Sequence, residues 1–171
     1  MSALHTALLI ALLLGLAPQG AEDTTPQLVA FADEIALSAL EDDAAEMLTD
    51  AGLHASISAR IKTPKSLAAK AERKGLIPDA VLDRIGLRVQ VDSVADCYAV
   101  LTEIHSRYVP VSGSQDDYIA HPKANGYQSL HTAVHTPIGI AEFQIRTPAM
   151  HAHAEHGGAS HSHYKAAQRS A

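Results

Sequence analysis

The sequence predicts an α+β domain in which helices flank a mixed β-sheet of about five strands. Strand-like and helix-like segments alternate in the first part of the chain, and a pair of strand-like segments follows later. With 171 residues, of which 47% are hydrophobic, the chain is long enough for one domain with a buried core. Its single cysteine excludes a disulfide-stabilised scaffold.

The sequence predicts an apolar segment and a linker over residues 1–26, followed by a domain over residues 27–171. The apolar run at 7–17 is shorter than the roughly 20 residues of a membrane-spanning helix. A buried or partner-facing helix and a secretory signal cleaved near Ala21 both remain open, and the lack of Lys and Arg before the run favours the helix. Three residues are typical of the linker: Pro18, Gly20 and Pro26.

Hydrophobic periodicity places the elements of the predicted domain. Apolar residues at helical spacing predict helices at 27–40, 41–52, 64–75, 94–108 and from 148 onward. Segments of alternating or β-rich composition predict strands at 53–62, 82–91, 127–136 and 140–147. The cap and stop signals are Gly52, Thr63 with Pro64, Gly75 and Ser93.

The helix at 94–108 is expected to bury one face, and the segment from Pro110 to Asn125 is expected to be a loop. The predicted buried positions are Val94, Cys97, Tyr98, Leu101 and Ile104. Cys97 is therefore interpreted as an unreactive core residue.

Charge is distributed unevenly along the chain. The net charge of −6 argues against a general nucleic-acid coat, and neither nucleic acid nor a membrane is expected as a partner. The first 59 residues have nine acids and no Lys or Arg, so all 13 basic residues lie in the remainder. An acidic leader followed by a basic body suggests that the body handles an anion.

The densest basic cluster surrounds the predicted helix at 64–75. It consists of Arg60, Lys62, Lys65, Lys70, Arg73 and Lys74. Cations beside a strand end and a helix N-terminus suit a polyphosphate, although a solvated basic helix is the simpler alternative. No GxxxxGK[ST] loop is present, so side chains would have to bind the phosphates.

Two carboxylates occur in otherwise apolar strand-like segments, Asp83 in LDRIGLRV and Glu142 in AEFQIRT. A carboxylate in such a segment is unexpected unless it is paired or binds a metal. If the two meet near the basic cluster, they could hold Mg²⁺ for nucleotide phosphates. Each residue taken singly could equally be a surface acid at a strand edge.

The polar stretch DYIAHPKANGYQSLHT offers groups that could hold a nucleotide. Lys123 could contact a phosphate, Asn125 and Gln128 could contact base or sugar edges, and Tyr127 could stack on a base. Gly126 would allow the turn that orients Tyr127.

A histidine-rich tract follows, comprising His151, His153, His156, His161 and His163. Its spacing matches no closed zinc pattern, so only adventitious metal binding is expected.

Six segments together resemble the synthetase domain of RelA/SpoT enzymes, over about residues 41–165. They are ARIKTPKSLAAK, LDRIGLRV, SVADCYAVLTEIHS, DYIAHPKANGYQSLHT, EFQIRT and MHAHAEHG with ASHSHYK. The resemblance implies a nucleotidyltransferase-like fold and transfer of pyrophosphate from ATP to the 3′-hydroxyl of GDP or GTP, giving (p)ppGpp and AMP. The family's hydrolase domain has no counterpart here, so the chain resembles a small stand-alone synthetase.

The resemblance also implies residue roles. The ATP-binding residues would be Arg60, Lys62, Ser66, Lys70, Arg73 and Arg88. The acceptor would be bound by Lys123, Asn125, Tyr127, His131 and Gln144. Asp83 would be the main Mg²⁺ ligand, and Glu142 would join it or act as general base on the 3′-hydroxyl. Arg146 would support the same strand.

Three positions depart from the family pattern. The segment before DYIA is Ser114-Gln115-Asp116-Asp117, Lys65 replaces a common aromatic residue, and Ser162 replaces a common tryptophan. The alternatives to an active synthetase are a weakly catalytic nucleotide-binding regulator and an exported nucleotide-modifying effector. A cytoplasmic location follows from the substrates, an adenine acceptor stays open, and a homo-oligomer is compatible with the sequence.

Overall fold

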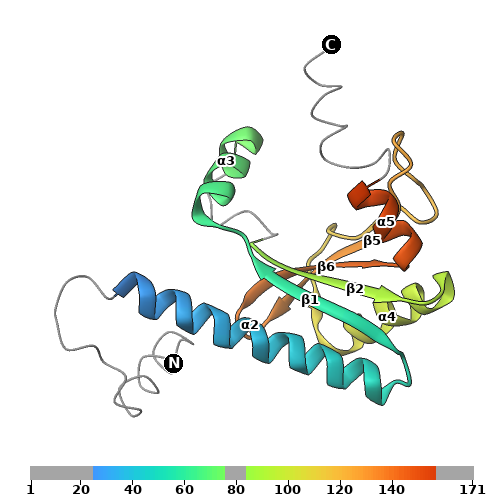
Figure 1. The fold of residues 1–171 in the computed structure, drawn as a ribbon, viewed down its shortest axis with the longest axis horizontal. Coiled ribbons are helices and arrows are strands. Elements are labelled where there is room, and N and C mark those ends of the chain that lie inside the picture. Colours follow the sequence, from blue (N-terminus) through green and yellow to red (C-terminus); the bar gives the residue numbers. More distant parts are fainter. Residues whose placement is uncertain (1–24, 76–83, 157–171) are drawn as a thin grey trace.

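The computed structural model describes residues 25–75 and 84–156 (Figure 1). The predictions for the apolar run at 7–17, for Asp83 and for the end of the histidine tract lie outside these residues. Within them, no helix is long and apolar enough to cross a membrane.

A mixed six-stranded sheet forms the centre of the fold, which confirms the predicted α+β class. Its strands are β1 (Ala55–Ile61), β2 (Ile85–Val91), β3 (Val109–Pro110), β4 (Asp116–Asp117), β5 (Leu130–Thr136) and β6 (Gly139–Arg146). The spatial order is β1-β2-β6-β5-β3, with β4 also paired to β5. Only β2 and β6 pair in parallel among the described strands.

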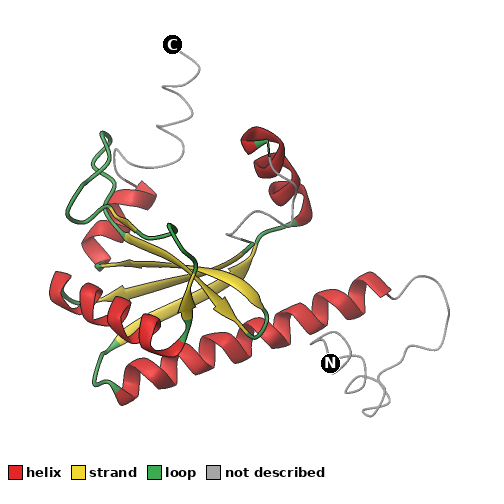
Figure 2. Cartoon of the chain, turned by 180° about the vertical axis from the view of Figure 1, so that it is seen from behind, coloured by secondary structure: helices red, strands yellow, loops and turns green. Residues whose placement is uncertain are grey.

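Four described helices surround this sheet: α2 (Thr25–Asp50), α3 (Pro64–Lys74), α4 (Val94–Arg107) and α5 (Pro148–His156). In both ribbon views α2 and α4 lie on one side of the sheet, whereas α3 and α5 rise on the other side (Figures 1 and 2). The chain therefore has one sheet face covered by long helices and one face that α3 and α5 flank.

Helix α2 corrects the prediction of two helices at 27–40 and 41–52. It is continuous, and Pro26 lies inside it rather than in the linker. The stretch contains neither Gly nor Pro between Gln27 and Ala51, so nothing interrupts the backbone hydrogen bonds. The helix ends where predicted, because Gly52 adopts a left-handed φ of 72°.

The predicted caps of α3 and α4 are confirmed. The Thr63 hydroxyl accepts a hydrogen bond from the backbone N–H of Ser66 at 3.3 Å, and Gly75 ends α3 with a φ of 65°. The Ser93 hydroxyl accepts one from the N–H of Asp96 at 3.1 Å.

The core lies between the sheet and helices α2 and α4. Alternate residues of β2 and β6 are buried there, among them Leu87, Val89 and Phe143. Helix α4 buries Cys97, Val100, Leu101 and Ile104 against them. The prediction that Val94 and Tyr98 are buried was wrong, since they are 43% and 38% exposed. The buried stripe of α4 is centred closer to Val100, which the prediction missed, so Val94 and Tyr98 lie at its edge.

Candidate active site on the open face of the sheet

The strand register aligns polar side chains in rows across the face opposite α2 and α4. One row reads Ser58, Arg88, Gln144 and His131, and its neighbour reads Arg60, Gly86, Glu142 and Ala133. Directly paired residues project to the same side of a sheet. The fold therefore gathers cations from β1 and β2 and a carboxylate from β6, which the sequence analysis assigned to one site.

A pocket of about 150 Å³ lies on these rows. It is lined by Ser58, Ala59, Arg60, Lys62, Gly86, Leu87, Arg88, Glu142 and Gln144. Gly86 leaves space at its centre, because a Cβ placed there would meet no other atom within 4 Å. This volume suits a phosphate group better than a whole nucleotide, since pockets for drug-sized ligands span about 300–1,000 Å³.

Glu142 is connected to the neighbouring loop through His131. The amide of Gln144 donates to Oε2 of Glu142 at 2.9 Å, and Nδ1 of His131 lies 3.5 Å from Oε1. The other ring nitrogen, Nε2, shares a hydrogen bond of 2.8 Å with the Tyr127 hydroxyl. Of the acceptor residues predicted from the family resemblance, Gln144 and His131 thus lie beside the pocket carboxylate, and Tyr127 is linked to it through His131.

The turn before Tyr127 has the predicted geometry. Gly126 has a φ of 76°, and its N–H donates to the carbonyl of Lys123 at 2.7 Å. The side-chain oxygen of Asn125 accepts from the N–H of Tyr127 at 3.2 Å. Asn125 therefore shapes the turn that positions the Tyr127 ring.

Tyr127 lies in an aromatic cluster with His131 and Tyr118. The Tyr118 ring meets Tyr127 edge-on, with centroids 6.1 Å apart, and the Lys123 ammonium lies 4.1 Å from the Tyr118 centroid. Burial is the main cause that raises the pKa of Tyr127, so its phenol stays protonated at neutral pH. Gln128 donates to the carbonyl of Ile119 at 3.2 Å and so supports this loop.

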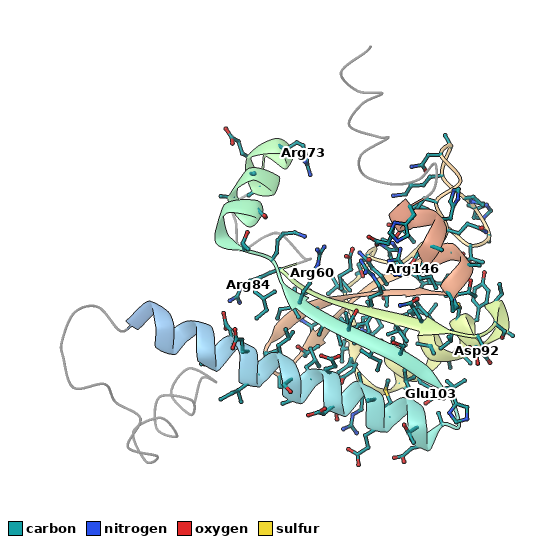
Figure 3. All side chains as sticks on the ribbon, in the orientation of Figure 1. Arg60, Arg73, Arg84, Asp92, Glu103 and Arg146 are labelled. Atoms are coloured by element: carbon teal, nitrogen blue, oxygen red, sulfur yellow. The ribbon has the colours of Figure 1, made fainter. Side chains whose placement is uncertain are left out.

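The structure brings only part of the predicted basic cluster to the pocket. Arg60 and Lys62 line it, whereas Arg73 lies near the far end of α3 and does not (Figure 3). Ser66 accepts a hydrogen bond from the Thr63 hydroxyl at 2.9 Å within the α3 cap. The side chains of Lys65, Lys70 and Lys74 lie outside the part of the molecule that can be described.

Three site residues were not singled out from the sequence: Gly86, Tyr118 and Glu155. Gly86 matters only through the space it leaves, and Tyr118 through a loop contact, so neither has a local sequence signal. Glu155 of α5 contacts two arginines, at 3.3 Å from an NH₂ group of Arg88 and 3.3 Å from one of Arg146. Glu155 lies within the histidine-rich tract, where only the histidines were considered as candidate ligands.

The segment 114–117, which departs from the family pattern, stabilises the loop. The Ser114 hydroxyl donates to the carbonyl of Val111 at 2.7 Å. Asp117 accepts from the N–H of Ala120 at 2.8 Å and from the Tyr98 hydroxyl at 3.0 Å. Ser114 and Asp117 therefore both have hydrogen-bond partners that anchor this segment.

Within residues 25–75 and 84–156, no group of three or more His, Cys, Asp or Glu side chains could hold a metal ion. His153 of the histidine tract lies instead with its Nε2 at 3.4 Å from the Asn125 carbonyl oxygen.

A family model described as the region found in RelA / SpoT proteins matches residues 59–169, which is more than half of the chain. The chain belongs to the RelA/SpoT family. A rice protein (Oryza sativa subsp. japonica) named probable GTP diphosphokinase RSH2, chloroplastic, is 41% identical over 150 residues, 86% of this chain and 21% of that protein. An Aquifex aeolicus protein named guanosine-3′,5′-bis(diphosphate) 3′-pyrophosphohydrolase is 49% identical over 115 residues, 67% of this chain and 16% of that protein.

This RelA/SpoT chain thus spans about one fifth or less of these curated relatives. Small alarmone synthetase 1 from Bacillus subtilis, in a crystal structure bound to its product pppGpp, is much closer in size. It is 27% identical with a TM-score of 0.64, and the match covers 78% of each chain. The predicted RelA/SpoT synthetase fold is therefore confirmed.

Proposed function

We propose that this RelA/SpoT domain synthesises (p)ppGpp by transferring pyrophosphate from ATP to the 3′-hydroxyl of GDP or GTP. The observation that supports this most is the pocket that combines Arg60, Lys62 and Arg88 with Glu142, beside the loop of Tyr127. Relatives named GTP diphosphokinase and small alarmone synthetase belong to the same family or share the fold. Because ATP and guanine nucleotides are cytoplasmic, we expect the reaction in the cytoplasm.

On the donor side, Arg60, Lys62 and Arg88 would neutralise the phosphates of ATP. Guanidinium groups suit this role because they bind phosphate oxygens through paired N–H donors. Ser66, Lys70 and Arg73 would contribute from α3, at the end of β1. Since neither Ser66 nor Arg73 lines the pocket, their contributions would be weaker than those of Arg60, Lys62 and Arg88.

On the acceptor side, Tyr127 would stack on the guanine base. Lys123, Asn125, His131 and Gln144 would position the phosphates and ribose. His131 bridges Tyr127 and Glu142, so a base held at Tyr127 would place its ribose toward Glu142.

The family resemblance implies Mg²⁺, and the pocket lining offers one carboxylate that could help to hold it. Glu142 offers carboxylate oxygens of the kind that Mg²⁺ prefers, and Asp83 would be the principal ligand. The ion would supply charge neutralisation for the transferring group.

The reaction would be an in-line displacement at the β-phosphorus of ATP. The 3′-oxygen of the acceptor forms the new P–O bond, the bond between the α,β-bridging oxygen and the β-phosphorus breaks, and AMP leaves. A ribose hydroxyl is a poor nucleophile at neutral pH, so a carboxylate within hydrogen-bond reach must take its proton. Glu142 would accept this proton, and the arginines would stabilise charge on the departing AMP.

The test is to incubate the pure chain with Mg²⁺, ATP labelled on its β-phosphate, and GDP, GTP or ADP, and to separate the products by anion exchange. We expect a 3′-pyrophosphorylated guanosine nucleotide and an equal amount of AMP. A labelled 3′-pyrophosphorylated adenosine nucleotide would instead establish an adenine acceptor. If nucleotide binds without AMP release, the chain is a regulator and the proposal is wrong.

A matched variant checks the metal ligand. Asp83→Asn removes a carboxylate charge and keeps the side-chain shape, so we expect turnover to be lost while the circular-dichroism spectrum stays unchanged. Near-normal turnover would remove Asp83 from the site.

A further inference from the structure

Glu155, near the end of α5, joins two arginines from adjacent strands. One of its carboxylate oxygens, Oε1, lies 3.3 Å from an NH₂ group of Arg88 on β2 and 3.3 Å from one of Arg146 on β6. The strand register pairs Arg88 with Gln144 and Gln90 with Arg146, so both arginines project from the same sheet face. A single carboxylate therefore links the helix to both strands (Figure 3 shows Arg146 beside α5).

The two arginines differ in how deeply they are buried. The Arg146 side chain is only 2% exposed, whereas that of Arg88 is 30% exposed and that of Glu155 is 41% exposed. An unpaired buried guanidinium is costly, so Arg146 holds Glu155 in place. The carboxylate then presents a fixed negative charge to Arg88, with which it forms an ion pair.

The surrounding groups keep the carboxylate ionised. Burial acts to raise the pKa of Glu155, but Arg88 and Arg146 outweigh it and hold the pKa below its usual value. His151 also faces this group, and burial followed by the two arginines lowers its pKa. His151 is therefore neutral at pH 7, which leaves the positive charge on the two arginines.

Arg88 also lines the pocket beside Glu142 and Gln144. Its Nε is buried without a hydrogen-bond partner among the described residues, so the contact with Glu155 is the fixed point of its guanidinium. We propose that Glu155 is a positioning residue that holds Arg88 toward the phosphates of ATP. This inference rests on the proposed function and names the donor-side residue that α5 controls.

Nucleotide binding tests the inference without depending on turnover. Glu155→Gln keeps the shape of the side chain and removes its charge, so Arg88 loses its ion-pair partner. We expect the affinity for a non-hydrolysable ATP analogue, measured by calorimetry, to fall about 10- to 100-fold, by analogy with the loss of outer-shell partners at metal sites. The affinity for GDP should stay within a factor of about two, because Arg88 contacts the donor phosphates and not the acceptor.

Three further variants separate positioning from a merely structural role. Glu155→Asp keeps the charge on a side chain one methylene shorter and should restore part of the ATP affinity. It replaces Glu155→Gln as the test variant if Glu155→Gln does not fold. In an Arg88→Ala background, Glu155→Gln should have little additional effect on ATP binding, because both changes remove the same interaction. Asp43→Asn breaks a helix carboxylate's ion pair with Arg107 on the other side of the sheet and should leave ATP affinity unchanged.

Unchanged ATP affinity in Glu155→Gln, additive losses with Arg88→Ala, or equal losses for ATP and GDP would each overturn the inference. A wild-type chain that binds no ATP would overturn it as well. If ATP affinity falls as expected but no pyrophosphate transfer occurs in the wild type, the proposed function fails while Glu155 keeps its positioning role.

Discussion

Adjacent residues of β6 show how differently the two faces of the sheet are used. Phe143 is fully buried, and its ring stacks beside Tyr108 with centroids 6.1 Å apart. Glu142, one step earlier, projects to the opposite face and lines the pocket. The packed face stabilises the fold, whereas the open face gathers charges that the proposed reaction needs.

The two faces also satisfy their polar groups differently. On the packed side, buried Thr132 shares a hydrogen bond of 2.9 Å with His105, and burial lowers the pKa of that histidine. On the open side, Arg88 and Glu142 both line a pocket. The Thr132–His105 pair on the packed side is therefore satisfied within the protein, while Arg88 and Glu142 on the open side face a pocket that a ligand could enter.

Glu142→Gln should separate the roles of the two faces most strongly. Loss of the proposed general base should lower kcat by about 10²- to 10⁴-fold. The melting temperature should remain close to that of the wild type, because the side chain is not part of the core. Steady-state kinetics and thermal unfolding of the same preparation check this, and near-normal kcat would remove Glu142 from the reaction.

Phe143→Ala should have the opposite outcome. Loss of a fully buried aromatic side chain should lower the free energy of unfolding by about 3–5 kcal/mol. Urea denaturation measures this, and ATP KM at low temperature should be unchanged in the molecules that stay folded. An unchanged unfolding midpoint would show that the packed face is not the main source of stability.

Gly86→Val tests the same division of roles inside the pocket itself. A Cβ at this position meets no atom within 4 Å, and valine suits a strand, so stability should be kept or raised. The added side chain would occupy ligand space, and an overpacking cost of about 1–3 kcal/mol corresponds to roughly 5- to 150-fold weaker ATP binding. Gly86→Ala should give a smaller loss. Unchanged ATP affinity in Gly86→Val would mean that ATP does not enter this pocket.

Local signals in the sequence predicted much of the fold. The Thr63 and Ser93 caps, the stops at Gly52 and Gly75, and the main strands depend on neighbours a few residues apart. The short strands β3 and β4 were missed, because two residues carry no periodicity and pair only through β5. The single α2 was missed because the acidic run at Glu41 resembles a boundary when no packing is known.

The candidate site was predictable where residue chemistry alone is informative. Arg60 and Lys62 were selected as part of a basic cluster that could bind an anion, and Glu142 as a carboxylate in an apolar strand; all three line one pocket. Glu155 could not be found in this way, because its importance comes from strands β2 and β6 that only folding brings beside α5.

Tyr127 tests the acceptor side with two variants. Tyr127→Ala should raise the acceptor KM through the loss of about 1–3 kcal/mol of stacking. Tyr127→Phe keeps the ring and loses only the hydrogen bond to His131. The free energy of acceptor binding should therefore fall by the smaller amount of about 0.5–1.5 kcal/mol. Initial rates over a range of GDP and GTP concentrations compare them. Equal acceptor KM in all three proteins would place the base elsewhere.

The smallest effect is expected at Cys97 on the packed face. Burial is the main cause that raises its pKa to about 11, and the side chain is fully buried. At pH 8 the native thiol should therefore react with an aromatic disulfide reagent far more slowly than in urea, because the thiolate is the nucleophile. Modification then requires opening of the packed face, and nucleotide bound to the open face should slow it further by stabilising the folded state. If saturating ATP or GDP leaves the rate unchanged, the exposure of Cys97 is a local event of α4, and the two faces are energetically independent.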